Sequence, residues 1–268
     1  FFLFLLLTIA LLLFIYRNQF RLLTVYTGSF LTGVIILYSP LLIRNAIVGV
    51  PLISQNAIGS IASIASSDVN YDPVQSYVLN LANATAILEK TGGKTMPAFI
   101  SSVQTHPNAI SYLKLVLKKA ALVFHRYEFP NNKNFYYYRI HAPILWFTFV
   151  NMLIIAPLGL VGLLVAIFQQ KKLWPVYLLL LMHFLLLVVF IVLSRYRIPF
   201  EVTLILFAGY SVSEVLRNAQ VNLKPTLLMI GGVLAAAIFV GRSLPEGITK
   251  IRGVDYQQPY NFYYQQLI

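Results

Sequence analysis

Residues 173–216 read LWPVYLLLLMHFLLLVVFIVLSRYRIPFEVTLILFAGYSVSEVL and contain two long apolar runs separated by one short polar motif. The runs, Leu173–Leu193 and Ile198–Leu216, are each close to the roughly 20 residues that a helix needs to cross a bilayer. Between them lies Ser194-Arg195-Tyr196-Arg197, which we interpret as a tight turn joining two membrane-spanning helices.

The composition of the whole chain also indicates a membrane protein. Of the 268 residues, 59% are hydrophobic and 10% are charged, whereas soluble domains have about 25% charged residues. We attribute the net charge of +12 to Lys and Arg that anchor helix ends and meet anionic lipid, and we expect no nucleic acid partner. Because cysteine is absent, the chain has neither a disulfide framework nor a thiolate metal site.

Four further apolar runs have the character of membrane spans: Phe1–Ile15, Leu22–Ile43, Pro143–Phe168 and Pro225–Gly241. The expected fold is therefore an all-α membrane protein with about six transmembrane helices. The first run is short for a span, so we expect a helix cut by the start of a C-terminal fragment. The expected divisions are helices in 1–43, a mainly helical domain in 44–142, helices in 143–241 and a tail in 242–268.

The short connectors between these runs differ in charge. Three of them are basic, and Lys and Arg in short loops mark the cytoplasmic side: Arg17 and Arg21, Lys171 and Lys172, Arg217 and Lys224. This predicts an inner (plasma) membrane protein whose domain 44–142, Arg-rich turn and tail 242–268 are extracytoplasmic.

Two helices are expected in the domain. Asp72-Pro73-Val74-Gln75 has the features of a helix start, and Gly92-Gly93 ends that helix. A second helix over Asn108–Arg126 has an apolar stripe at helical spacing, formed by Leu113, Val116, Leu117, Ala120, Ala121 and Phe124. Its lysines lie off the stripe, so the helix either lies in the lipid headgroup layer or packs on its own domain.

Arg195 and Arg197 are the most informative candidate site residues. Membrane proteins have most Lys and Arg of their short loops on the cytoplasmic side, so two arginines in a short extracytoplasmic turn are unusual. Guanidinium groups bind phosphate bidentately, and a lipid headgroup or lipid-linked sugar would supply phosphate at that depth. The alternative is an ion pair between one of these arginines and Glu201.

Two other motifs are candidates. Arg44-Asn45-x-x-x-Gly49-x-Pro51 follows a predicted span, and Arg44 either reaches the same phosphate layer or only snorkels. The run from Tyr127 to Tyr136 includes Glu128 and Asn131 and is typical of a structured loop; Glu128 has a possible acid–base role or a solvated one. The four histidines are scattered, so no cofactor is identified and a divalent metal requirement stays open.

Together, these three motifs resemble the bacterial dolichyl-phosphate-mannose-protein mannosyltransferase family, which includes the aminoarabinose transferases among the C-class membrane glycosyltransferases. The matching residues are Arg44-Asn45, Gly49-x-Pro51, Tyr127-Glu128-Phe129-Pro130-Asn131-Asn132, Asn134-Phe135-Tyr136 and Arg195-Tyr196-Arg197-Ile198-Pro199.

The resemblance implies transfer of a sugar from a polyprenyl-phosphate donor to a protein, lipid or glycan acceptor outside the cytoplasm. It implies that Arg195 and Arg197, beside Tyr196, hold the donor phosphate, with Arg44, Asn45, Glu128 and Asn131 as further substrate-binding candidates. The family's catalytic carboxylate lies upstream of Phe1, so we expect this fragment to be inactive alone.

Other functions remain open on the sequence. The stretch Gly59–Ile64 lacks a second glycine and a Gly-Asn pair that relatives have after the position of Asn56, which leaves the sugar and the acceptor undetermined. A transporter or flippase would place ionisable groups near the membrane midplane, where His183 is a candidate. A non-enzymatic assembly protein is the third possibility.

Overall fold

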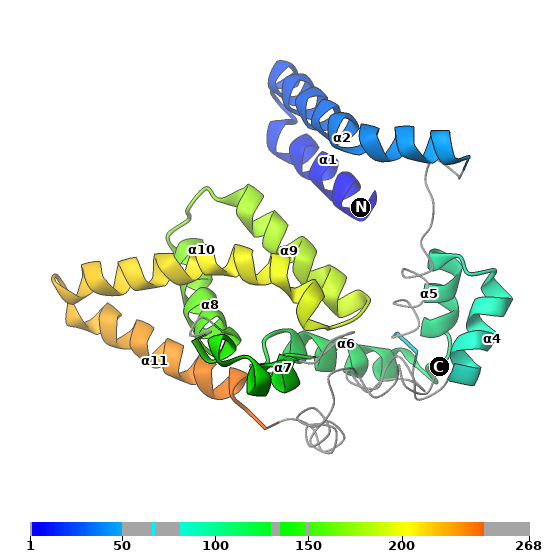
Figure 1. Cartoon of the computed structure of the whole chain (residues 1–268). Helices are drawn as coiled ribbons and strands as arrows, with labels where there is room; N and C mark the ends of the chain where they lie inside the picture. The colour runs from blue at the N-terminus through cyan, green and yellow to red at the C-terminus, as the bar shows by residue number, and fades with distance from the viewer. Residues whose placement is uncertain (1, 50–65, 68–80, 130–134, 148–150, 244–268) are drawn as a thin grey trace. The chain divides into compact units, whose positions relative to one another are not determined.

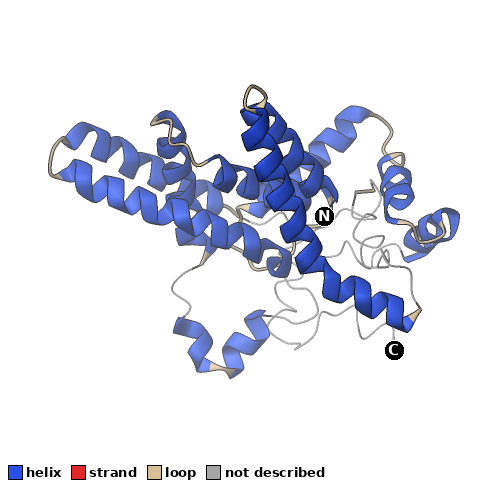
Figure 2. Ribbon diagram, turned by 90° about the horizontal axis from the view of Figure 1, so that it is seen from above, coloured by secondary structure: helices blue, strands red, loops and turns tan. Residues whose placement is uncertain are grey.

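The computed structural model describes residues 2–49, 66–67, 81–129, 135–147 and 151–243, which are drawn in colour in Figure 1. All regular secondary structure within these residues is helical (Figure 2), as the sequence predicted. The helix start at Asp72, the stretch after Asn56, Asn131 and nearly all of the tail lie outside the described residues. The chain forms two compact units, Phe1–Asn56 and Ala57–Ile268.

The first unit is a pair of helices, α1 (Phe2–Tyr16) and α2 (Phe20–Val48). The helix is longer than the predicted span Leu22–Ile43, because α2 continues to Val48 and stops at Gly49, whose φ of 72° is in the left-handed region. That conformation suits glycine because it lacks a Cβ atom. Arg44 therefore lies within the helix and not in a connector.

The second unit begins, in the described residues, with a small pair of helices. α4 (Leu81–Thr91) ends at Gly92 and Gly93, which confirms the predicted stop: their φ angles are 59° and 68°. α5 (Thr95–Val103) was not foreseen in the sequence. The two helices bury Ile87 against Ala98.

α6 (Ala109–Val123) confirms the predicted second helix of the domain, with Asn108 accepting a hydrogen bond from the Ser111 N–H at 2.9 Å. Of the two alternatives for its apolar stripe, packing of the whole stripe on its own domain is wrong, because Leu113 and Leu117 are 53% and 61% exposed. The buried positions are Leu115, Lys119, Leu122 and Val123.

Lys119 is buried because its side chain donates a hydrogen bond to a carbonyl group at the end of another helix. Its Nζ donates to the Phe190 carbonyl at 2.8 Å, where α9 (Trp174–Val189) has run out of intrahelical donors. Burial lowers the pKa of Lys119 to about 7. A residue that the helical pattern assigns to solvent thus fastens α6 to α9.

Between Met152 and Val240, four of the described helices pack together: α8 (Met152–Phe168), α9, α10 (Ser194–Ala219) and α11 (Leu223–Val240). Figure 1 shows α10 and α11 as an antiparallel hairpin. α8 approaches α10 closely at Gly159 and Gly162, since a Cβ at Gly162 would overlap the carbonyl oxygen of Phe207. Small residues permit such close contacts between apolar helices.

Three helices in the described residues are long and apolar enough to cross a membrane: α2, α10 and α11. α8 and α9 are apolar but shorter, with 17 and 16 residues. The predicted single span Pro143–Phe168 is wrong in its first part. A 3-10 helix, η1 (Pro143–Phe147), follows the short helix α7 (Phe135–His141), and α8 starts only after Asn151 caps it.

The predicted turn at Ser194–Arg197 is also wrong. These residues form the first turn of α10, because the N–H groups of Tyr196 and Arg197 both donate to the Leu193 carbonyl at 3.0 Å. The connection from α9 is made by residues 190–193 instead. The arginines are therefore held on a helix, with fixed directions.

Candidate functional site

Arg197 is completely buried and uses all three of its guanidinium nitrogens. Its Nε donates to Glu201 Oε1 at 2.6 Å and its Nη2 to Glu128 Oε1 at 2.8 Å. Its Nη1 donates to the His125 carbonyl at 2.7 Å. The ion-pair alternative considered for this motif therefore holds for Arg197, and a second carboxylate joins the predicted partner Glu201.

His125 positions the backbone that receives Arg197. Its Nδ1 accepts the Tyr127 N–H at 2.9 Å, so Nε2 carries the proton and donates to the Arg242 carbonyl at 3.0 Å. Burial, together with the nearby guanidinium groups, lowers the pKa of His125 to about 4. The neutral imidazole thereby ties the end of α6 to the segment after α11.

A cavity of about 350 Å³ lies at the start of α10, beside the two carboxylates that bind Arg197. It is built from the segment after α6, from α7, from the cap of α8 and from the first two turns of α10. Its lining consists of Arg126, Glu128, Phe135, Tyr136, Arg139, Asn151, Ser194, Arg195, Ile198 and Glu201.

Three arginines of this cavity have no carboxylate partner in the described part of the chain: Arg126, Arg139 and Arg195. The Arg139 guanidinium stacks 4.0 Å above the Trp146 ring, and Arg195 is exposed. With Arg197 they make four guanidinium groups against two carboxylates, which leaves a net charge of +2. The positive end of the α10 dipole adds to this field.

Such an arrangement favours an anion. Cations at the N-terminus of a helix are unfavourable by themselves, whereas an anion placed there meets the positive end of the helix dipole and the guanidinium donors together. Among the described residues, no group of three or more His, Asp or Glu side chains could hold a metal ion. Phosphate and carboxylate groups are the ligands with matching chemistry.

The other residues predicted from the sequence lie in different places. Glu128 and Arg195 line the cavity, while Tyr196 packs partly buried against the hydrophobic core. Arg44 and Asn45 belong to the first unit, where the exposed Arg44 donates to Asn45 Oδ1 at 3.2 Å.

Sequence reasoning missed several lining residues, above all Arg126 and Arg139. Arg126 stands immediately before the Tyr127-Glu128 motif, and Arg139 directly follows three tyrosines. That proximity was the available signal. Because the domain contains other basic residues, this proximity was not enough to predict Arg126 and Arg139 as residues of the site.

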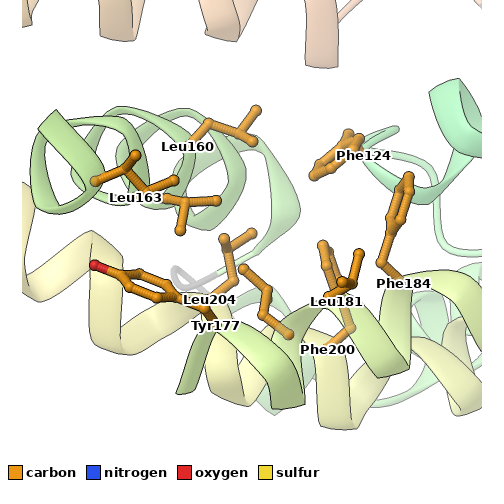
Figure 3. Close-up of a pocket in the computed structure, with 10 residues that line it drawn as sticks. Phe124, Leu160, Leu163, Tyr177, Leu181, Phe184, Phe200 and Leu204 are labelled. Atoms are coloured by element: carbon orange, nitrogen blue, oxygen red, sulfur yellow. The ribbon is translucent and has the colours of Figure 1, made fainter. Parts of the chain in front are cut away.

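A second cavity of about 410 Å³ is apolar (Figure 3). Side chains of α8, α9 and α10 converge on it together with Phe124: Leu160, Leu163, Ile167, Tyr177, Leu180, Leu181, Phe184, Phe200 and Leu204. The rings of Phe124 and Phe200 meet edge to face, with centroids 5.5 Å apart. Phe200 precedes Glu201 and Phe124 is two residues before Arg126, so the same two segments line both cavities.

The opposite end of α10 carries a separate polar cluster. The buried Glu214 accepts from Arg217 Nη2 at 2.6 Å and from Gln169 Nε2 at 3.1 Å. Tyr210 in turn donates to Gln169 Oε1 at 2.5 Å. The charged residues of α10 thus lie in its first two and last two turns, and those of the last two turns neutralise each other.

Comparison with known proteins identifies no relative: no protein-family model, no curated protein and no solved structure matches this chain.

Proposed function

We propose that this chain is part of a membrane glycosyltransferase that uses a polyprenyl-phosphate-linked sugar as donor. The observation that carries the proposal is the cavity at the start of α10, where Arg126, Arg139 and Arg195 have no carboxylate partner in the described residues. The acceptor is a protein, lipid or glycan outside the cytoplasm.

The arginines would act on the phosphate in two ways. Bidentate guanidinium contacts bind and orient it. When the bond from the sugar to the phosphate oxygen breaks, the departing lipid phosphate gains negative charge. Fixed cations that face this developing charge lower the barrier because they need no reorganisation.

The apolar cavity supports a lipid-linked ligand in particular. Its lining is hydrocarbon and aromatic, and Phe200 and Glu201 place its wall beside the charged cavity. A phosphate attached to an isoprenoid chain would place the phosphate among the arginines and the first isoprene units between α8, α9 and α10. A free sugar phosphate would leave the apolar cavity unused.

The proposed topology has six spans, α1, α2 and α8 to α11, with the charged cavity on the extracytoplasmic side. α8 and α9 are each about 25 Å long at 1.5 Å per residue, which is slightly less than a typical hydrocarbon core. Along α10, the cavity residue Arg195 is in the first turn and Arg217 is in the last turn. The basic connectors thus favour the Arg217 end as cytoplasmic.

A transporter or flippase for a lipid-linked substrate is the second candidate. His183 favours it, because this ionisable side chain lies, partly buried, in the middle of the apolar helix α9. An ionisable group inside a membrane span is a functional candidate. The position of the other charges, at the two ends of α10, favours the transferase.

The decisive experiment compares Arg195→Ala with Arg217→Ala in the natural full-length protein, in membranes supplied with a radiolabelled polyprenyl-phosphate sugar. Arg195→Ala should lower sugar transfer about a hundredfold or more, while Arg217→Ala, a control at the other end of the same helix, should stay within about threefold. Normal transfer by Arg195→Ala contradicts the proposal. Movement of the lipid across the bilayer without sugar transfer favours the transporter.

A further inference from the structure

The charged cavity contains two carboxylates as well as the arginines. Glu128 and Glu201 both line it, and their side chains are 25% and 20% exposed. A cavity that bound only a phosphate would be weakened by both, because like charges repel. Their presence needs a reason beyond anion binding.

Neutralising Arg197 explains only one of them. A single guanidinium carries one positive charge, yet Arg197 donates to Glu201 through Nε and to Glu128 through Nη2. The triad therefore has a net charge of −1. Each carboxylate uses its Oε1 atom for Arg197, and within the described residues neither Oε2 atom has a hydrogen-bond donor.

The neighbours of these carboxylates suit a hydroxylated ligand. Asn151 lines the same cavity and uses its Oδ1 to cap α8, which leaves its amide N–H groups available to a ligand. Phe135 and Tyr136 add aromatic faces, and Tyr136 is fixed because its ring stacks on that of Tyr127 with centroids 4.8 Å apart. Acceptors, amide donors and aromatic faces together are the groups that bind a sugar ring.

We infer that Glu128 and Glu201 bind hydroxyl groups of the sugar that is attached to the phosphate, so that one cavity recognises both parts of a phosphosugar. This inference rests on the proposed function. Arg197 is then a positioning residue, which aims both carboxylates and touches no ligand. Hydrogen bonds from hydroxyl groups to charged acceptors are stronger than neutral ones, which offsets the repulsion between carboxylate and phosphate.

Two matched ligands test this in detergent micelles. The first is farnesyl phosphate esterified with a hexose, and the second is farnesyl methyl phosphate, which has the same lipid and the same single negative charge but no sugar. Calorimetric titration of the wild-type chain should show that the hexose ligand binds at least about tenfold more tightly. Equal affinities would overturn the inference, and no binding of either ligand would overturn the proposed function itself.

The variants Glu128→Gln and Glu201→Gln separate ligand binding from a structural role. Each should weaken binding of the hexose ligand about tenfold, while binding of the methyl ligand should stay equal or tighten because a negative charge near the anion is gone. Glu214→Gln removes a buried, ion-paired carboxylate from the other end of α10 and should leave both affinities unchanged. Equal weakening of both ligands in the cavity variants would show a structural role only and overturn the inference. If a cavity variant does not fold, the wild-type comparison still decides.

Discussion

Arg195 and Arg197 lie two residues apart in one helical turn, yet their environments are opposite. Arg197 is buried and bonded to two carboxylates and a carbonyl, while Arg195 is exposed at the cavity without a carboxylate partner in the described residues. Side chains two residues apart in a helix point in directions about 200° apart. Arg197 therefore faces the core, whereas Arg195 faces the cavity. The two arginines therefore have separate roles, one in stability and one in binding.

Removal of Arg197 should accordingly destabilise the fold. Arg197→Ala leaves Glu128, Glu201 and the His125 carbonyl without their shared donor, and breaking a buried ion pair costs about 3–5 kcal/mol. Arg195→Ala should change the free energy of unfolding by less than about 0.5 kcal/mol, as is usual at exposed sites. Thermal unfolding of both variants in detergent measures this. Equal loss of stability in the two variants would contradict the assigned roles.

His125 predicts a dependence of stability on pH. Its pKa in the folded protein is about 4, below its ordinary value of 6.5, so the unfolded chain binds more protons between these values. The stabilisation is complete above about pH 6.5 and is lost as the pH falls toward 4, by about 3 kcal/mol in total. Unfolding temperatures from pH 7 to 4 should fall less steeply in His125→Gln than in the wild type; parallel curves would exclude His125 as the cause.

The sequence was informative about the residue types at the site and less so about their partners. The i, i+4 spacing made the Arg197–Glu201 pair predictable. The contact with Glu128, 69 residues away, depends on how the segment after α6 packs against α10. No local pattern reports such a contact.

At the scale of elements, hydropathy located the long apolar helices of the described residues but misplaced the ends of several of them. The predicted span from Pro143 was too long because hydropathy ignores the cap at Asn151, whose side chain accepts the Leu153 N–H at 3.0 Å. For α6, the helical pattern predicted an apolar face that includes Leu113 and Leu117, because Lys119 was expected to lie outside the apolar face. The carbonyl at the end of α9 made burial of that lysine possible.

The contact between α8 and α10 provides a prediction for these elements. A methyl group at Gly162 would overlap the Phe207 carbonyl, so Gly162→Ala should force the helices apart and cost about 1–3 kcal/mol. Gly209→Ala is the matched control on α10, because nothing lies within 4 Å of its added Cβ; it should be neutral or stabilising. Chemical or thermal unfolding in detergent measures both. Equal effects would contradict the close approach at Gly162.

At the scale of the whole molecule, composition and the long apolar runs together predicted a helical, apolar chain, and the described residues bear out that class. The number of spans is harder to predict, because α8 and α9 fall just below the length that a span typically requires. Orientation in the bilayer depends on the charges of the connectors.

The orientation can be tested by labelling, since the chain has no native cysteine. Gln104→Cys, in the domain, should react with a membrane-impermeant maleimide in intact cells. Lys172→Cys and Val221→Cys, in the two basic connectors of the second unit, should react only after permeabilisation, because basic connectors stay in the cytoplasm. The reverse pattern would place the charged cavity on the cytoplasmic side and contradict an extracytoplasmic transferase.

The most direct test of the account is the position of the phosphorus atom in an experimental structure of the chain with farnesyl phosphate bound. We predict that the phosphate lies within hydrogen-bond distance of Arg195 and of Arg126 or Arg139, with the isoprenoid chain entering the apolar cavity at Phe200. A phosphate bound beside Lys171 and Lys172 at the other end of the helices, or an empty arginine cavity at saturating ligand, would contradict it.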